Sequence, residues 1–247
     1  MKFLIVRRMV QLSAAGLLLL PAVWPANPLW VGTYLSSQVF GVALTDPLAA
    51  VEVTLAGKEV WWPLIWSVVP LLIINIVLGR IFCSWICPLN TIFEFSALVR
   101  TSKNNSRNNE LWPYLLLAVL PGLALMIGLP LFTILSPIGL VSRAVIYGLG
   151  FELIFILLLV AAELFYKRKI WCRNLCPVGA LYGLMGNWRQ LTVKIDLAVC
   201  RNCRKCHAVC TQQVNVGSNS LIDRLTCTNC GDCIDVCPEK AVHFSWK

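Results

Sequence analysis

The sequence predicts an all-α bundle of four transmembrane helices, followed by a small α+β domain that is rich in cysteine. The 247 residues are 58% hydrophobic and only 13% charged, and their mean hydropathy is +0.73. One soluble core of this length would not normally bury so much apolar surface. The residues after position 183 contain no long apolar run but hold eight of the 12 cysteines. We therefore expect a membrane domain at residues 1–183 and a separate domain at residues 184–247.

Four apolar runs are each long enough to cross a bilayer, whose hydrocarbon core of about 30 Å takes ~20 helical residues. Backbone groups in lipid must be satisfied within the segment, and the runs lack the alternation of barrel strands, so we expect helices. Arg7 and Arg8 precede the first run as in a secretory signal, but no small-residue cleavage site follows it, so we expect this run to be retained. Glu152 is the one ionisable interruption of the fourth run. The runs cover residues 9–30, 60–79, 111–142 and 144–162.

Lys and Arg residues set the expected orientation. They gather at the N-terminus, in the second connection and after the fourth run, whereas the first and third connections hold only Lys58 and Arg143. The positive-inside rule therefore places both chain ends in the cytoplasm. Most of the net charge of +9 comes from these Lys and Arg residues beside the apolar runs. No basic stripe stands apart from the membrane ends, so we expect no nucleic-acid partner.

Two pairs of similar segments indicate an internal duplication of two helices. RIFCSWICPLN (80–90) and KIWCRNLCPVG (169–179) each follow an apolar run and place a cation three residues before Cys-x3-Cys-Pro. TDPLAAVEV (45–53) precedes the second run as LSPIGLVSR (135–143) precedes the fourth. With two crossings in each half, both Cys-x3-Cys-Pro turns face the cytoplasm, and the halves could be related by an axis along the membrane normal.

The last eight cysteines have the spacing of a bacterial ferredoxin that holds two [4Fe–4S] clusters. In that pattern three close cysteines bind one cubane and the fourth binds the other. Disulfides are unfavourable on the reducing side of the membrane, and zinc sites use pairs of ligands with longer gaps. Thr211 stands where the first quartet would usually carry Pro. The expected ligands are Cys200, Cys203, Cys206 and Cys237 for the first cluster, and Cys227, Cys230, Cys233 and Cys210 for the second.

The remaining cysteines lie in the two turns, at Cys83, Cys87, Cys172 and Cys176. Residues four apart share a helix face, so each turn presents two thiols side by side, and the duplication would bring all four together. Such a set has the composition of a tetrathiolate metal or cluster site. Thiols that cycle with a disulfide, or small buried side chains, are the alternatives.

The segments TDPL, RIFCSWICPLN and WCRNLCPVGALYG, followed by the two quartets, closely resemble the NapH family of ferredoxin-type membrane subunits associated with periplasmic nitrate reductase. MauN, NosR and CcoG proteins share similar parts. The resemblance implies a subunit of a quinol dehydrogenase in the bacterial inner membrane. Electrons from menaquinol or ubiquinol would pass to a NapG-like iron–sulfur protein, and onward to a periplasmic cytochrome and reductase.

Two further features of the sequence restrict this function. The only histidines, His207 and His243, lie in the domain expected at residues 184–247, which we call the tail. No histidine pair can therefore hold a haem between the membrane helices. Quinol oxidation also releases protons, and intramembrane carboxylates are functional candidates by default. We expect a quinol or proton site at the outer face, formed by Asp46, Glu52, Arg143 and Glu152, or else a polar network that anchors the helices.

The position of the quinol site and the function of the turns stay open at this stage. An outer site would lie about 30 Å from clusters beyond the inner face, whereas an inner site would lie beside the turn cysteines. One alternative function is a membrane copper reductase or maturation factor, because soft thiolates suit Cu(I). Another is a docking scaffold whose clusters are structural.

Overall fold

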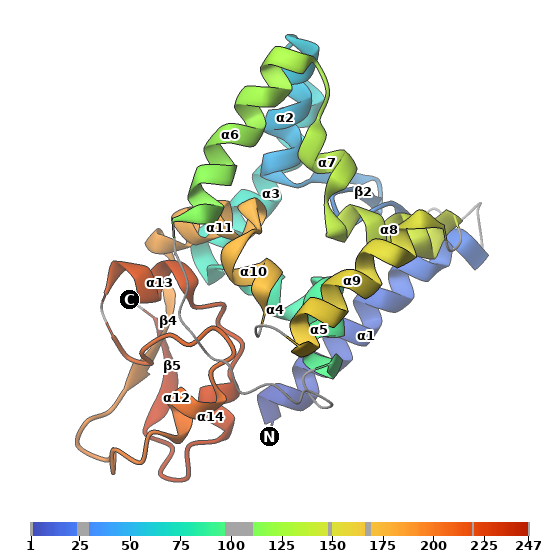
Figure 1. Ribbon diagram of the computed structural model, residues 1–247. Helices are drawn as coiled ribbons and strands as arrows, with labels where there is room; N and C mark the ends of the chain where they lie inside the picture. The colour runs from blue at the N-terminus through green and yellow to red at the C-terminus, as the bar shows by residue number, and fades with distance from the viewer. Residues whose placement is uncertain are drawn as a thin grey trace.

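The structure is a computed structural model that describes residues 2–23, 30–96, 111–147, 150–165, 169–218 and 220–246 (Figure 1). Within these ranges the chain is mostly helical and has two small antiparallel sheets. Helix α1 (Lys2–Val23) is the one described helix that is long and apolar enough to cross a membrane, over Lys2–Leu20. The other apolar helices in the described ranges are shorter.

The connection after α1 forms a three-stranded sheet and a short helix. Strands β1 (Trp30–Gly32), β2 (Ser36–Val39) and β3 (Val42–Thr45) pair in sequence order. Helix α2 (Pro47–Gly57) starts directly after β3, because the Asp46 side chain accepts hydrogen bonds from the amides of its first turn and Pro47 suits that turn. The run expected at 9–30 therefore ends earlier, and Trp30 lies in a strand.

The later apolar runs are divided differently from the prediction. Helix α3 (Trp62–Leu78) matches the second run. The third run is not one helix: Gly128 adopts a left-handed conformation and prolines follow it, so the chain forms three helices. These are α6 (Trp112–Ile127), α7 (Leu131–Leu135) and α8 (Pro137–Tyr147), and the fourth run becomes α9 (Phe151–Phe165).

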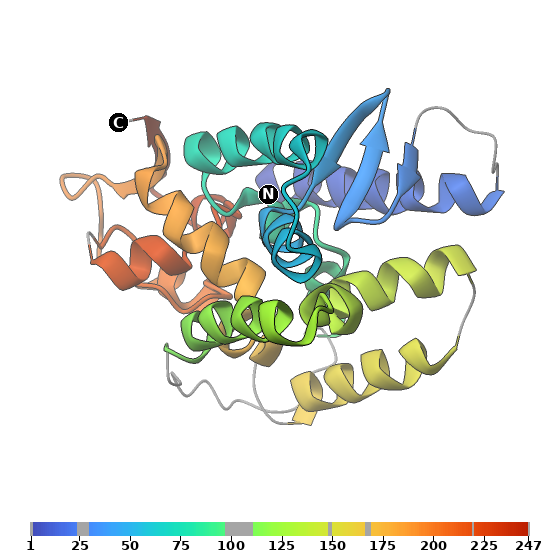
Figure 2. The ribbon, with the colours of Figure 1, turned by 90° about the horizontal axis from the view of Figure 1, so that it is seen from above.

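The sequence repeat corresponds to a repeat of structural elements. In the first half α2 and α3 are followed by α4 (Ile81–Trp85) and α5 (Pro88–Ser96). In the second half α8 and α9 are followed by α10 (Ile170–Asn174) and α11 (Pro177–Met185). Helices of the two halves pack against each other. Helix α2 of the first half packs on α6, which begins the second half, and α8 of the second half lies between α1 and α9 (Figure 2).

The tail is an α+β unit that packs beneath α11 (Figure 1). A 3-10 turn, η1 (Gly186–Trp188), joins α11 to β4, and β4 pairs antiparallel with the last strand. The approach of the tail to α11 is close, because a Cβ at Gly183 would lie 2.5 Å from the Leu225 carbonyl oxygen. The tail elements are β4 (Leu191–Ile195), α12 (Lys205–Val209), α13 (Leu221–Thr226), α14 (Asp232–Asp235) and β5 (Val242–Trp246).

Candidate metal centres

Three cavities in the described part of the chain are each lined by four cysteines. We call them the centre-1 cavity, the centre-2 cavity and the turn cavity. The two tail groups are those that sequence spacing predicts, the turn group is the one that the duplication predicts, and ligation itself stays a prediction. The cysteines are Cys200, Cys203, Cys206 and Cys237 in the centre-1 cavity, Cys210, Cys227, Cys230 and Cys233 in the centre-2 cavity, and Cys83, Cys87, Cys172 and Cys176 in the turn cavity.

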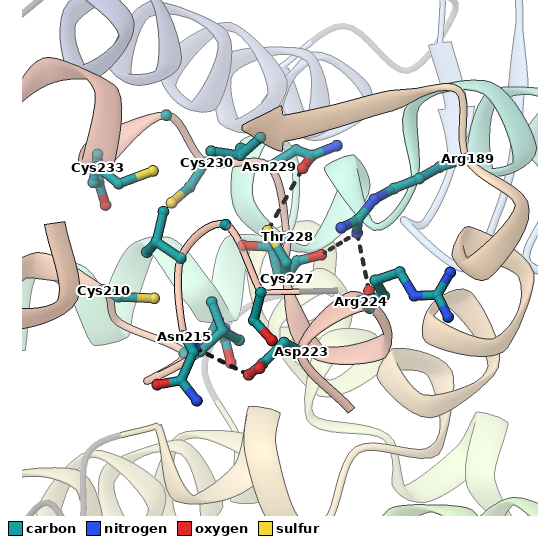
Figure 3. A pocket seen from close by; sticks show the side chains of 18 residues that line it. Arg189, Cys210, Asn215, Asp223, Arg224, Cys227, Thr228, Asn229, Cys230 and Cys233 are labelled. Atoms are coloured by element: carbon teal, nitrogen blue, oxygen red, sulfur yellow. Dashed lines mark hydrogen bonds between the residues drawn. The ribbon is translucent and has the colours of Figure 1, made fainter. Parts of the chain in front are cut away.

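The centre-2 cavity lies between the β4–β5 side of the tail and helix α13. Figure 3 shows Cys210, Cys230 and Cys233 with their sulfur atoms directed into the same space. The Cys227 thiol donates to Asn229 Oδ1 at 3.6 Å. Arg189 lines the same cavity, is only 5% exposed, and donates to the Cys227 carbonyl at 3.1 Å. Among the described residues no carboxylate pairs with this guanidinium, so an anionic group in the cavity would complete its environment.

The centre-1 and centre-2 cavities are neighbours. Cys233 belongs to a buried apolar cluster with Val216 and Val242, and cysteines of both quartets pack against this cluster. Two cysteines cross between the cavities: Cys210 follows the first three cysteines in sequence but lines the second cavity, and Cys237 follows the second three but lines the first.

The turn cavity is built by two turns with the same backbone geometry. The Cys87 amide donates to the Phe82 carbonyl at 3.0 Å, and the Cys176 amide donates to the Trp171 carbonyl at 2.9 Å. Pro88 and Pro177 then begin new helices, so each second cysteine stands at a helix start. Cys87 and Cys176 are 6% and 7% exposed. The duplication thus brings four thiols into one buried space.

Burial, and to a smaller extent the neighbouring thiols, favour the protonated form of the two second cysteines. They raise the pKa of Cys87 to about 12, and they raise the pKa of Cys176 to about 12 as well. A metal would therefore displace protons on binding. Across the described ranges, no three Cys, His, Asp or Glu side chains are placed to share a single metal ion. The same holds for the two tail quartets, where spacing predicts cubanes whose cysteines each bind a different iron.

The cations that precede each turn are buried and hold the tail. Arg80 is 6% exposed, lines the turn cavity, and donates to the Leu225 carbonyl at 2.8 Å. A Cβ at Gly179 would lie 2.7 Å from Arg80 Nη2, so a larger residue there would displace the guanidinium where it crosses α11. No described carboxylate pairs with Arg80. Arg80 therefore brings an unpaired positive charge to the turn cavity, as Arg189 does to the centre-2 cavity.

Lys169 occupies the equivalent position in the second half and contacts different groups. Its Nζ donates to Asn90 Oδ1 at 2.6 Å and to Thr211 Oγ1 at 3.2 Å, and the residue is only 3% exposed. Thr211 directly follows Cys210, at the position where ferredoxins usually have Pro. The departure from the ferredoxin pattern thus supplies a hydroxyl that binds the second turn to the tail.

We expect Thr211→Val to lower the free energy of unfolding by about 1.5–3 kcal/mol, because a buried ammonium loses a hydrogen-bond acceptor. Denaturant unfolding of the purified chain measures it. Thr192→Val is the matched control, since the Thr192 hydroxyl makes a neutral bond to the Ser245 carbonyl at 3.3 Å and should contribute about 1 kcal/mol. Equal losses in the two variants would contradict the role assigned to Thr211.

Glu94 on α5 pairs with three cations from two parts of the chain, the start of α1 and the residue before α10. It pairs with Arg7 at 3.5 Å, with Arg8 at 2.8 Å and with Lys169 at 3.8 Å. Arg7 also pairs with Asp232 of the tail at 2.9 Å. Burial would raise the pKa of Glu94, but Lys169 and Arg7 hold it below its usual value. This network ties the start of α1 and the first turn to the tail.

The four residues expected at an outer quinol site have separate partners. Glu52 is buried and accepts from the Phe132 and Thr133 amides, at 3.1 and 2.9 Å, at the start of α7. Arg143 donates to the Ile134 carbonyl. Glu152 lies in the first turn of α9. No contact between described residues joins all four.

Asp46 has a different setting from the one expected. It is buried, it accepts a hydrogen bond from the Tyr182 hydroxyl on α11, and it lies within electrostatic range of Cys83 and Cys176. Tyr182 also packs edge-on against Phe82 of the first turn. The connection that was expected at the outer face therefore returns to the turn cavity, and the separation of about 30 Å expected for an outer site does not apply to Asp46.

Sequence reasoning missed Glu94, Tyr182 and Gln212 in this region. Gln212 lines both the centre-2 cavity and the turn cavity. It is 6% exposed, and its Oε1 has no hydrogen-bond partner among the described residues. The signal for Arg80 and Lys169 was present, because a cation precedes each turn at the same offset.

Comparisons with known proteins agree with the thiol chemistry. A family described as "4Fe-4S binding domain" matches residues 60–105 and 149–195, one segment in each half, and a "4Fe-4S dicluster domain" matches residues 192–238. The methylamine utilization ferredoxin-type protein MauN of Paracoccus denitrificans is 32% identical over 225 residues, covering 85% of this chain and 76% of that protein. The ferredoxin-type protein NapH of Escherichia coli is 31% identical over 220 residues, covering 85% and 75%. No solved structure matches the chain.

Proposed function

The chain belongs to the family of ferredoxin-type iron–sulfur proteins that includes NapH and MauN, and from this premise we propose that it is the membrane electron-transfer subunit of a quinol dehydrogenase. It takes electrons from membrane quinol and passes them to a partner iron–sulfur protein that feeds a periplasmic reductase. The eight tail cysteines hold two [4Fe–4S] clusters, which supply one-electron carriers.

The observation that carries this proposal is the sequence of contacts between the three cavities. The turn cavity lies at the ends of the apolar helices and shares Gln212 with the centre-2 cavity, which in turn packs against the centre-1 cavity. Three thiol-lined cavities thus adjoin one another from the ends of the apolar helices into the tail. A structural scaffold would not need this arrangement, whereas electron transfer does.

Exposed apolar side chains support a membrane position for four helices, α1, α3, α6 and α9. Large hydrophobic residues on each are open to the surroundings, as a lipid-facing surface requires. Together with the positive-inside pattern, they support four crossings with both termini in the cytoplasm. Examples are Leu12 at 62%, Trp66 at 71%, Met126 at 84% and Leu158 at 63% exposure.

The residue proposed to receive the quinol protons, one after the other, is Asp46, and the Tyr182 hydroxyl that donates to it can relay a proton but does not store one. A quinol that becomes a quinone releases two electrons and two protons, so an acceptor for protons must lie near the first acceptor for electrons. The Asp46 carboxylate is hydrogen-bonded to Tyr182 and lies near the thiols of the turn cavity. Glu52 and Arg143 instead hold the α7–α8 connection, and we leave them and Glu152 out of the site.

We expect Asp46→Asn to slow quinol-dependent reduction of the clusters by about 10²-fold or more, because the amide cannot accept the proton. The measurement is the bleaching of iron–sulfur absorption after a quinol analogue is added to the purified complex without oxygen. Tyr182→Phe keeps the ring packing and removes only the hydroxyl, so we expect a smaller loss in the same direction.

Reduction by dithionite provides the control, since it bypasses the quinol site and should be unchanged in both variants. Glu59→Gln removes an exposed carboxylate from the connection that follows α2 and should reduce at the wild-type rate. If quinol never bleaches the clusters of the intact complex, the proposed function is wrong. If Asp46→Asn reduces normally, the proton acceptor lies elsewhere.

A further inference from the structure

The turn cavity has features that two pairs of ordinary buried cysteines would not need. Four thiols line one space, and they come from two turns whose backbone hydrogen bonds match. Free cysteines used as small apolar side chains have no reason to occur in matched pairs that face each other. Within the same wall lies a cation, Arg80, that pairs with no described carboxylate. Its buried Nε also has no acceptor among the described residues.

The charges around the cavity call for an anion inside it. Arg80 and Lys169 are both at least nine-tenths buried and flank the two turns. The Glu94 carboxylate is already shared among Lys169, Arg7 and Arg8. An unpaired buried charge costs several kcal/mol, so a neutral set of thiols would leave Arg80 poorly compensated. Four thiolates around iron would carry net negative charge in the cavity that this guanidinium lines.

The spacing of the thiols favours a cluster over one ion. Four cysteines around one zinc hold their sulfurs about 2.3 Å from a common point, so three or more would converge closely. No described group of three does so in the turn cavity or in the two tail quartets. In a cubane each cysteine binds a different iron, and the sulfurs stand farther apart. The turn quartet shares with the tail quartets the absence of three side chains that converge on one point among the described residues.

From these observations we infer that the turn cavity holds a third iron–sulfur cluster, which exchanges electrons with the centre-2 cluster across Gln212. In this step the third cluster loses one electron and the second gains one. Gln212 contributes to the walls of both cavities, directly after Cys210 and Thr211, and its unpaired Oε1 is buried between them. The inference deepens the proposed function. Only the source of the electrons and the direction in which they move rest on that proposed function.

Iron and acid-labile sulfide counts on the full chain, purified without oxygen, test the cluster. We expect about twelve irons per chain, and about eight in the double variant Cys87→Ala, Cys176→Ala, with the paramagnetic resonance signals of the tail clusters retained. Val178→Ala is the matched control, because Val178 is 1% exposed beside Cys176 and removing two methyl groups there leaves every thiol in place. It should keep about twelve.

Several outcomes would overturn the inference. Eight irons in the unaltered chain, with four thiols that react with an alkylating reagent, would mean that the turn cysteines are unliganded. Copper or zinc bound in the ratio of one per chain, and lost in the double variant, would mean a mononuclear site. If the double variant does not fold, the single variant Cys172→Ser reports instead, through loss or alteration of one cluster signal while two persist. None of these measurements uses quinol, so they stand apart from the proposed function.

The contact across Gln212 has a separate test in the midpoint potentials of the clusters. Gln212→Glu adds a negative charge between two cavities, which disfavours the reduced, more negative form of a cluster. We expect the potentials of the third and second clusters to fall while that of the first changes least. A fall in the midpoint potential of one cluster only, or the same fall in all three, would show that Gln212 does not lie between the second and third clusters.

Discussion

Cys210→Ala is expected to remove the second tail cluster, about four irons, while the first cluster remains. The reason is spatial: Cys210 follows Cys200, Cys203 and Cys206 in the sequence but lines the cavity of the other quartet. The loss should also stop quinol from reducing the first cluster, because the centre-2 cavity lies between the turn cavity and the centre-1 cavity. Iron analysis and cluster-resolved paramagnetic resonance measure both effects.

A pair of double variants tests which cysteines share a cluster from iron content alone. The test does not depend on assigning paramagnetic resonance signals to particular clusters. Cys203→Ala combined with Cys237→Ala should lose only about four irons, since both residues line one cavity. Cys203→Ala combined with Cys210→Ala should lose about eight, since the two residues line different cavities. Dithionite should still reduce the first cluster in the Cys210→Ala single variant. The reverse pattern of losses would show that the fourth cysteines do not cross.

The cysteine groups were accessible to sequence reasoning because cluster ligands lie close together in the chain. The tail spacing alone groups Cys210 with the second quartet, and the match between residues 80–90 and 169–179 alone suggests that two turns meet. Fold details that depend on single residues were accessible in part. Gly128 and Pro137 inside the third apolar run are signals of interruption, yet length and hydropathy favoured one continuous helix.

Contacts between distant parts of the chain could not be predicted in this way. Asp46 was expected at the outer face because it lies between two apolar runs, and nothing local indicates that α2 returns toward the turns. The hydrogen bond from Tyr182 joins residues 136 positions apart. Glu94 likewise has no local pattern, since its partner Arg7 lies on another helix. Hydropathy gives the lengths of segments, but it does not say which polar groups they bring together.

The two cations of the repeat show how the duplicated halves have diverged. Arg80 and Lys169 stand at the same offset before their turns, and both are buried. Arg80 donates to carbonyls of α13 and faces the turn cavity, whereas Lys169 joins Thr211 to Asn90 and Glu94. One tail cannot present the same surface to both halves, so the halves bind it through different groups. A planar guanidinium suits several carbonyls, and a compact ammonium suits the smaller polar pocket.

Glu94→Gln is expected to lower the free energy of unfolding by about 3–5 kcal/mol, because it leaves three cations without their shared carboxylate. Arg7 and Lys169 are 2% and 3% exposed, so water cannot replace the lost charge. Denaturant unfolding of the detergent-solubilised chain measures the effect. Glu239→Gln is the matched control, because its pair with Arg201 is largely exposed and should contribute less than about 1 kcal/mol.

The dependence on pH separates loss of charge from loss of packing in this variant. The pKa of Glu94 in the folded chain lies below its ordinary value of 4.5, so the folded state favours the ionised carboxylate. A lowered pKa adds stability above the unfolded value, and this stability is lost as the pH falls through the folded value. The difference between the original chain and Glu94→Gln should therefore be constant at neutral pH and shrink below about pH 4.5. A difference that persists undiminished in acid would mean that the carboxylate charge does not stabilise the junction between the first turn and the tail.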